Sequence, residues 1–194
     1  MLLYSYAPIS GDKAPLPHSL ENYLGSASEK NRDGRHAALS LLAFLAQKAE
    51  LSADAPVKAD AFGRPFFDVP NAPFFNLSHS GALVAAAFGD ARVGIDIQLH
   101  DGKIDLPRLA ARFFSAEERQ TLAVADSAAD TFFELWTKKE ALGKYLGTGL
   151  TPIIRKDTLT LAKEHGVTFQ TVTLDYDGER YTLTVCSAEC PTLV

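Results

Sequence analysis

The stretch VGIDIQ at residues 93–98 decides how the middle of this chain is expected to fold. Val93, Ile95 and Ile97 alternate with glycine or polar residues, which is typical of a strand with one buried face. Asp96 interrupts that pattern, because aspartate is depleted in strands and an unpaired carboxylate is costly to bury. The stretch therefore predicts a strand that presents a carboxylate, and it leaves open which positive group neutralises it.

The surrounding sequence predicts further strands. PFFNLSHS (73–80) and ALVAAAFG (82–89) precede this strand, with Gly81 and the Gly89–Asp90 pair as turn signals between them. LLYSY (2–6) is a first strand. Near the C-terminus, VTLDY and YTLTV flank Asp177–Gly178, a pair typical of a tight hairpin turn.

Capping patterns predict three main helices. SASE at 26–29 opens a helix that runs to about Lys48, and SAEE at 115–118 opens another. Ser127 caps the longest, SAADTFFELWTKKEALGKYLG, which Gly147 ends. The polar loop at 99–104 is the best boundary, so we expect an N-terminal half at 1–100 and a C-terminal half at 101–194.

Composition and charge narrow the class of protein. The 194 residues are 46% hydrophobic and 22% charged, as in ordinary globular proteins. The net charge of −5 argues against a broad nucleic-acid or anionic-membrane surface. Cys186 and Cys190 match no zinc or redox spacing, and no signal peptide or membrane span is visible. We therefore expect a cytoplasmic protein with reduced cysteines.

WTKKEALGKYLGTGL at 136–150 is the second informative stretch. On a helix, Trp136, Glu140 and Lys144 follow at i, i+4 and i+8 and share one face. A solvated Glu–Lys pair beside a core tryptophan is the ordinary explanation. A carboxylate with cations around it, including Lys138 and Lys139, is also what a metal and polyphosphate site needs.

Asp96 and NLSHS (76–80) have similar alternatives. An aspartate at a strand end can cap the next loop, or it can be held toward a crevice, where Asp96 and Glu140 would supply two oxygen ligands to Mg²⁺. NLSHS lacks the G-x-S-x-G pattern of a nucleophilic serine. His79 is either an ordinary loop histidine or a donor to a phosphate, as the neighbouring serines could be.

In chain order, FGRP, FFNLSHS, VGIDIQ, RFFSAEE and FFELWTKKEALGKYLGTGL closely resemble the 4′-phosphopantetheinyl transferase superfamily, in its longer single-chain form. Most of the residues that match the family lie between Gly63 and Leu150. Its core is G-[IV]-D followed by W-x-x-K-E-[AS]-x-x-K, and Asp96 and Glu140 lie 44 positions apart, as that pattern asks.

The resemblance implies an α/β (α+β) fold of two similar halves related by a pseudo-twofold, each a small, mostly antiparallel sheet packed with a long helix. It implies Mg²⁺-dependent transfer of phosphopantetheine from coenzyme A to a serine of an apo acyl carrier protein or peptidyl carrier domain, with release of 3′,5′-ADP. Fatty-acid, polyketide and peptide carriers stay open as substrates, and we expect a monomer with no nucleic-acid or membrane partner.

The resemblance also implies roles for particular residues. Asp96, Gln98 and Glu140 match the metal-ligand positions, although Gln98 stands where the long form usually has a charged glutamate. The proton acceptor stays open between Glu118, Glu140 and a metal-bound water, because Glu118 is also the fourth residue of a capping box. Coenzyme contacts are implied for Arg35 (with Arg32 as an alternative for the 3′-phosphate), Arg64, Pro65, Ser78, His79, Lys139 and Lys144.

Two other functions compete with transfer. A metal-dependent nuclease could use the same acidic residues, but the acidic chain lacks a basic, aromatic-interleaved stripe. A catalytically weak binder of coenzyme A or carrier protein is the second, and Gln98 is the feature in its favour.

Overall fold

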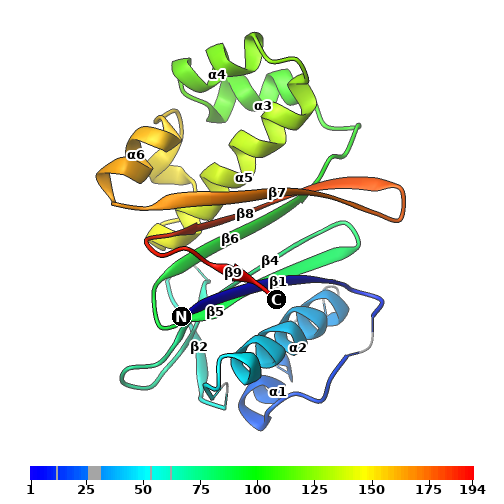
Figure 1. The fold of residues 1–194 in the computed structure, drawn as a ribbon, viewed down its shortest axis with the longest axis vertical. Coiled ribbons are helices and arrows are strands. Elements are labelled where there is room, and N and C mark those ends of the chain that lie inside the picture. Colours follow the sequence, from blue (N-terminus) through cyan, green and yellow to red (C-terminus); the bar gives the residue numbers. More distant parts are fainter. Residues whose placement is uncertain (12, 26–31, 53, 62) are drawn as a thin grey trace.

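The computed structural model describes residues 1–194 except 12, 26–31, 53 and 62 (Figure 1). The predicted cap at 26–29 lies outside the described residues. The elements in chain order are β1 (Leu2–Pro8), α1 (His18–Gly25), α2 (Arg32–Lys48), β2 (Val57–Ala59), β3 (Pro65–Phe67), β4 (Phe74–Ser80), β5 (Leu83–Gly89), β6 (Val93–Leu99), α3 (Leu106–Phe113), α4 (Ala116–Ala123), α5 (Ala128–Leu146), a 3-10 turn (Thr151–Ile153), α6 (Thr158–Glu164), β7 (Thr168–Tyr176), β8 (Glu179–Ser187) and β9 (Thr192–Leu193).

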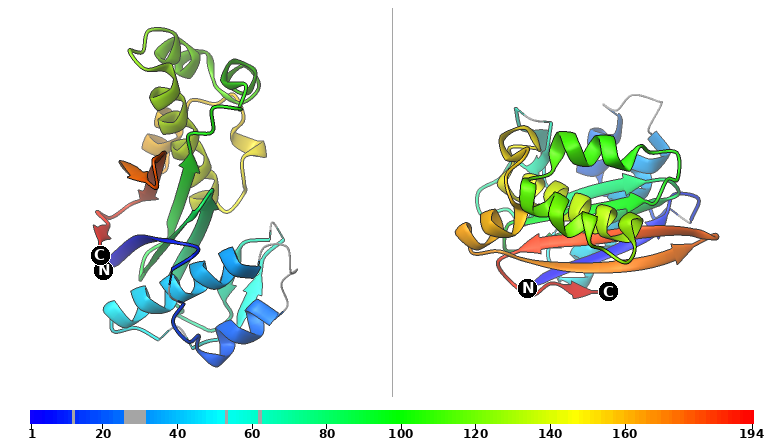
Figure 2. Two further views of the ribbon diagram at one scale, coloured as in Figure 1. Left: turned by 90° about the vertical axis from the view of Figure 1, so that its right-hand side faces the viewer. Right: turned by 90° about the horizontal axis from the view of Figure 1, so that it is seen from above.

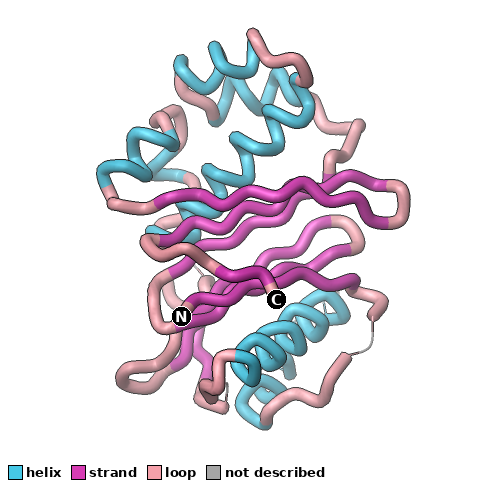
Figure 3. The backbone as a smooth tube through the Cα atoms, viewed as in Figure 1, coloured by secondary structure: helices cyan, strands magenta, loops and turns pink. Residues whose placement is uncertain are grey.

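Two antiparallel sheets form the centre of the molecule, with helices on their outer sides (Figures 2 and 3). The first sheet has the order β4-β5-β1-β9, in which only β9 runs parallel to its neighbour, and the second has the order β6-β8-β7. β2 and β3 form a separate short pair. The predicted α+β class is confirmed. No helix among the described residues is long and apolar enough to cross a membrane.

The two sheets share one connectivity. In each, a strand is followed by a long helix and then by two strands, and the last strand pairs with both others: β1, α2, β4, β5 in the first sheet and β6, α5, β7, β8 in the second. This repeated order is what two similar halves require. The pseudo-twofold relation itself stays a prediction.

Strand pairing also bears on where the halves meet. β6 pairs with β8 in the second sheet, while β9, near the C-terminus, returns to pair with β1. The expected division at residue 100 stays a proposal, and these pairings favour a boundary between β5 and β6 instead.

Alternating side chains build the cores on both sides of each sheet. Buried residues of α2, including Leu39, Leu42 and Leu45, pack against one face of the first sheet. Ile95 and Ile97 belong to a second core that lies between the two sheets. The opposite face of β6 is therefore turned toward α5, and it carries residues 94, 96 and 98.

Gly94 sets how closely α5 approaches β6. A Cβ atom at this position would lie 2.0 Å from the Ala141 carbonyl oxygen and 2.6 Å from the Tyr145 amide nitrogen. Any larger side chain would therefore push the helix away from the strand. Because Glu140 and Lys144 lie on this helix and Asp96 lies two residues after Gly94, the glycine brings the three together.

Candidate active site

A pocket of about 260 Å³ lies where β4, β6 and α5 meet. It collects residues that are far apart in the sequence. Its lining is Leu77, Ser78 and His79 from β4, Asp96 and Gln98 from β6, and Glu140 and Lys144 from α5. The helical face predicted from i, i+4 spacing is divided: Trp136 stacks on Phe132 in an aromatic cluster, while the other two residues face the pocket.

Asp96 is buried, with 5% of its surface exposed. Its Oδ1 atom accepts hydrogen bonds from the Ser78 hydroxyl and the Lys144 ammonium, both at 2.8 Å. Its Oδ2 atom has no hydrogen-bond partner among the described residues. Lys144 therefore supplies a positive group beside the carboxylate, and one carboxylate oxygen stays available to a ligand.

Lys144 and Glu140 complete the charged part of the pocket. The Lys144 ammonium donates to Asp96 Oδ1, to the Ser78 hydroxyl at 2.9 Å and to the Ile95 carbonyl at 2.9 Å. Burial, reinforced by the negative charge of Asp96, raises the pKa of Glu140 to about 7, and Lys144 opposes the shift. Two carboxylates thus share one pocket in which Lys144 offsets only part of their charge.

The donors in this pocket fit a magnesium ion. Mg²⁺ commonly takes one or two protein carboxylates and completes its octahedron with water and substrate oxygens. Asp96 has an oxygen without a partner among the described residues, Glu140 is the second carboxylate, and Gln98, whose amide oxygen is a neutral donor, lines the same pocket. Among the described residues, no group of three or more His, Cys, Asp and Glu side chains is placed to hold a metal.

An adjoining pocket of about 190 Å³ shares Leu77, Ser78 and His79 with the first. It is further lined by Arg35, whose guanidinium lies 5.8 Å from the centre of the Tyr23 ring. Arg32, the alternative cation, is exposed and is not part of this lining. Tyr23 was not singled out from the sequence, because a lone tyrosine in a helix carries no signal that distinguishes a pocket from a core.

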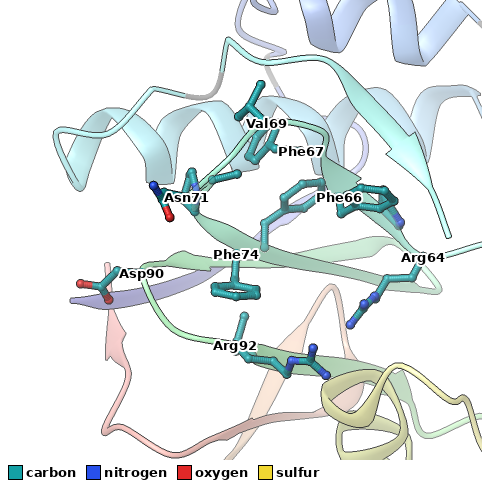
Figure 4. Close-up of a pocket in the computed structure, with 13 residues that line it drawn as sticks. Arg64, Phe66, Phe67, Val69, Asn71, Phe74, Asp90 and Arg92 are labelled. Atoms are coloured by element: carbon teal, nitrogen blue, oxygen red, sulfur yellow. The ribbon is translucent and has the colours of Figure 1, made fainter.

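Arg64 and His79 line different pockets, and the predicted coenzyme contact of Arg64 stays a prediction. Arg64 lines a larger pocket, of about 550 Å³, together with Arg92, Phe66 and Phe74 (Figure 4). Its Nε atom lies 3.1 Å from Asp60 Oδ2, and its guanidinium group lies against Gly147 at the end of α5. Pro65 lines this pocket and the Arg35 pocket. The predicted Gly-Arg-Pro contacts are therefore split between two pockets.

Glu118 and Lys139 lie together, but they do not line the pocket around Asp96. Glu118 Oε2 accepts from the Ser115 amide in the predicted capping box, and Oε1 accepts from the amide and hydroxyl of Thr158. Lys139 Nζ lies 3.0 Å from Glu118 Oε1 and donates to the Lys156 carbonyl. Burial lowers the pKa of Lys139, and Glu118 opposes that shift. This arrangement favours the structural interpretation of Glu118.

Comparison with known proteins gives consistent relatives. Residues 92–186 match the family model described as the 4′-phosphopantetheinyl transferase superfamily. A 4′-phosphopantetheinyl transferase of Bacillus subtilis is 32% identical over 139 residues, covering 66% of this chain and 60% of the relative. The transferase psf-1 of Bacillus pumilus is 43% identical over 98 residues, covering 50% and 41%. AcpT of Escherichia coli O157:H7 is 32% identical over 99 residues, covering 50% and 51%. The chain thus spans 41% to 60% of the length of these relatives.

Proposed function

We propose that this chain, which belongs to the 4′-phosphopantetheinyl transferase superfamily, transfers the 4′-phosphopantetheine arm of coenzyme A to a serine hydroxyl of an apo carrier protein. The observation that carries the proposal is the meeting of Asp96, Glu140 and Lys144 in one pocket between β6 and α5. Relatives with this printed activity support it.

Charge neutralisation is the main requirement of this reaction. The pyrophosphate of coenzyme A repels a nucleophile, and the departing 3′,5′-ADP gathers negative charge as the bond breaks. A bound Mg²⁺ would supply positive charge there, held by Asp96 and Glu140, with Gln98 as a neutral third ligand. Lys144, at the same wall of the pocket, would bind the pyrophosphate oxygens and orient the attacked phosphorus.

The serine nucleophile must also lose its proton. Glu140 lines the pocket, where its carboxylate or a water bound to the proposed Mg²⁺ would be placed to accept this proton. Glu118, by contrast, is 3% exposed and bonded to Ser115, Thr158 and Lys139. We therefore assign proton acceptance to Glu140 or a metal-bound water, and a structural role to Glu118.

The adjoining Arg35 pocket suits the nucleotide end of coenzyme A. His79 borders both pockets, so a molecule that occupies both would pass this side chain. Arg35 is a suitable partner for the 3′-phosphate, because guanidinium groups bind phosphate through two parallel hydrogen bonds. Coenzyme A would then run from the Arg35 pocket to the pocket of Asp96 and Glu140.

The partner would be an apo acyl carrier protein or peptidyl carrier domain. We further propose a monomeric, cytoplasmic enzyme of the holo-acyl-carrier-protein synthase type. Carrier proteins are often acidic. Arg108, Arg112 and Arg119, on α3 and α4, are cations that such a surface could contact.

The test follows both products. Purified protein is incubated with coenzyme A, Mg²⁺ and a panel of apo acyl and peptidyl carriers, and with EDTA in a parallel sample. We expect equal amounts of modified carrier, detected by intact mass, and of 3′,5′-ADP, detected by chromatography. Release of 3′,5′-ADP without modified carrier, or no reaction with any carrier, would refute the proposal. Equal transfer in EDTA would refute its metal dependence.

A further inference from the structure

Thr137 is a wholly buried threonine in the middle of α5. Threonine is a weaker helix former than alanine or leucine, and a buried hydroxyl is costly unless it is hydrogen-bonded. The hydroxyl donates to the Phe133 carbonyl at 2.9 Å and lies 2.8 Å from the Thr184 hydroxyl of β8. An apolar side chain could fill this position without any partner, so burial alone does not account for the hydroxyl.

Three threonine hydroxyls form a chain with one direction. Thr184 lies 3.0 Å from the Thr171 hydroxyl of β7, in addition to its contact with Thr137. A hydroxyl has a single proton, and that of Thr137 is given to carbonyls of its own helix. Thr184 therefore donates to Thr137, and Thr171 donates to Thr184. The chain joins α5 to β8 and β7 through polar atoms, which are satisfied only when the helix and the strands keep this arrangement.

The hydroxyl contact stands beside the pocket of Asp96 and Glu140. Thr184 is directly opposite Asp96 in the β6–β8 ladder, so the two side chains are on the same face of the sheet, the face turned toward α5. On the helix, Thr137, Glu140 and Lys144 follow at i, i+3 and i+7 and share one face. One contact with the sheet, Thr137 with Thr184, precedes Glu140 on α5. The other, Lys144 with Asp96, follows it.

We propose that Thr137 and Thr184 are positioning residues, whose hydrogen bond sets the register of α5 on the sheet so that Glu140 faces Asp96. The inference rests on the proposed function, in which these two carboxylates hold Mg²⁺. Magnesium demands near-ideal octahedral geometry, and a slide or rotation of α5 would move one carboxylate relative to the other. The two threonines act through the helix and do not touch the metal, because both are 0% exposed and neither lines the pocket.

The test measures Mn²⁺ binding to the metal-free protein by calorimetry, without coenzyme A or carrier protein. Thr137→Val and Thr184→Val each replace a hydroxyl by a methyl group of similar size. Each is expected to weaken Mn²⁺ binding about 10-fold, the lower end of the effect of groups that lie behind metal ligands. The double variant is expected to lose no more than the larger single loss, because both changes remove the same hydrogen bond. Thr137→Ser, which keeps the hydroxyl, is expected to bind Mn²⁺ nearly as the wild type does.

Thr158→Val is the matched control. Thr158 is 1% exposed, and its hydroxyl donates to Glu118, away from the pocket. This variant is expected to lower the free energy of unfolding without changing Mn²⁺ affinity. If Thr137→Val does not fold, Thr184→Val breaks the same hydrogen bond from a strand, where valine is favoured.

Three results would overturn the inference: wild-type Mn²⁺ affinity in the Thr137→Val and Thr184→Val variants, an equal loss in Thr158→Val, or single losses that add in the double variant. In each of them the wild type still binds Mn²⁺, so the metal site of the proposed function stands. Wild-type protein that binds no Mn²⁺ would overturn that metal site, and the inference with it.

Discussion

The Lys144 ammonium lies 2.8 Å from Oδ1 of Asp96, although 48 positions separate the two residues in the chain. The contact joins the strand and the helix whose motifs suggested a phosphate-transfer site. It also explains how a carboxylate can be buried in β6: a cation from α5 pairs with one oxygen, and the other oxygen, Oδ2, has no hydrogen-bond partner among the described residues.

Glu140→Gln is expected to stabilise the metal-free protein at alkaline pH while removing transfer. The pKa of Glu140 is raised to about 7 from the usual 4.5 of a glutamate, so the folded state holds its proton more tightly than the unfolded state does. Stability is therefore lost as pH rises from about 4.5 to 7, and the glutamine avoids a cost of about 1 to 3 kcal/mol above that range. Thermal unfolding of the wild type and Glu140→Gln in EDTA, at pH 5 and at pH 8, measures this difference in stability. Glu134→Gln, an exposed position on the same helix, is the control. A less stable Glu140→Gln variant at pH 8 would contradict the explanation.

Gln98 is expected to affect the Mg²⁺ concentration that the proposed transfer requires. Gln98→Glu adds a negative charge beside Asp96 and Glu140, so half-maximal activity is expected at lower Mg²⁺ concentration. Gln98→Ala should cost little, because water can occupy a ligand position. A titration of activity against Mg²⁺ for the wild type, Gln98→Glu and Gln98→Ala measures these differences in metal requirement. If Gln98→Ala proves as inactive as Asp96→Ala, the Gln98 side chain is required for transfer and water cannot replace it.

Arg35 and Arg64 are expected to differ in their effect on coenzyme recognition. Loss of a charge-assisted hydrogen bond costs roughly 1.5 to 3 kcal/mol, so Arg35→Ala should bind coenzyme A about 10- to 100-fold more weakly. For dephospho-coenzyme A, which lacks the 3′-phosphate, the Arg35→Ala variant and the wild type should have the same affinity. Arg64→Ala should keep the preference for coenzyme A, since Arg64 faces the other pocket. The reverse pattern in a binding assay would restore Arg64 as the phosphate contact.

Glu118 and Lys139 are expected to act on stability. Removing one partner of a buried ion pair leaves an unpaired charge and costs about 3 to 5 kcal/mol. Glu118→Gln and Lys139→Met should each lower the free energy of unfolding in urea, and the double variant should recover part of the loss. Transfer per folded molecule should stay near that of the wild type. If Glu118→Gln abolished transfer with an unchanged unfolding curve, Glu118 would be the proton acceptor instead.

Local features of the fold could be predicted from the sequence, because their causes are local. The alternation in VGIDIQ, the Asp177–Gly178 turn and the caps at Ser115 and Ser127 depend on residues within a few positions of one another. Long-range partners could not be predicted in the same way. Nothing near β6 in the sequence indicates that it pairs with β8.

The candidate site shows the same division. The family resemblance carried by the motifs around Asp96, Glu140 and Lys144 predicted that they share a site, and the structure places them in one pocket. Lys139, adjacent to Glu140, does not line this pocket and pairs with Glu118 instead. The hydrogen bonds from backbone amides of β6 to side-chain oxygens of β4, including the Ser78 hydroxyl, depend on the packing of the two sheets and have no sequence signature.

The central claim is tested most directly by the intact mass of an apo carrier protein after incubation with coenzyme A and Mg²⁺, with wild-type enzyme and with Asp96→Asn in parallel. Asparagine has nearly the same shape as aspartate but removes the charge that would bind the metal, so the fold should persist, as its thermal unfolding would show. We predict that the carrier gains one phosphopantetheine with the wild type and none with Asp96→Asn over the same period. Near-wild-type modification by Asp96→Asn would contradict the account.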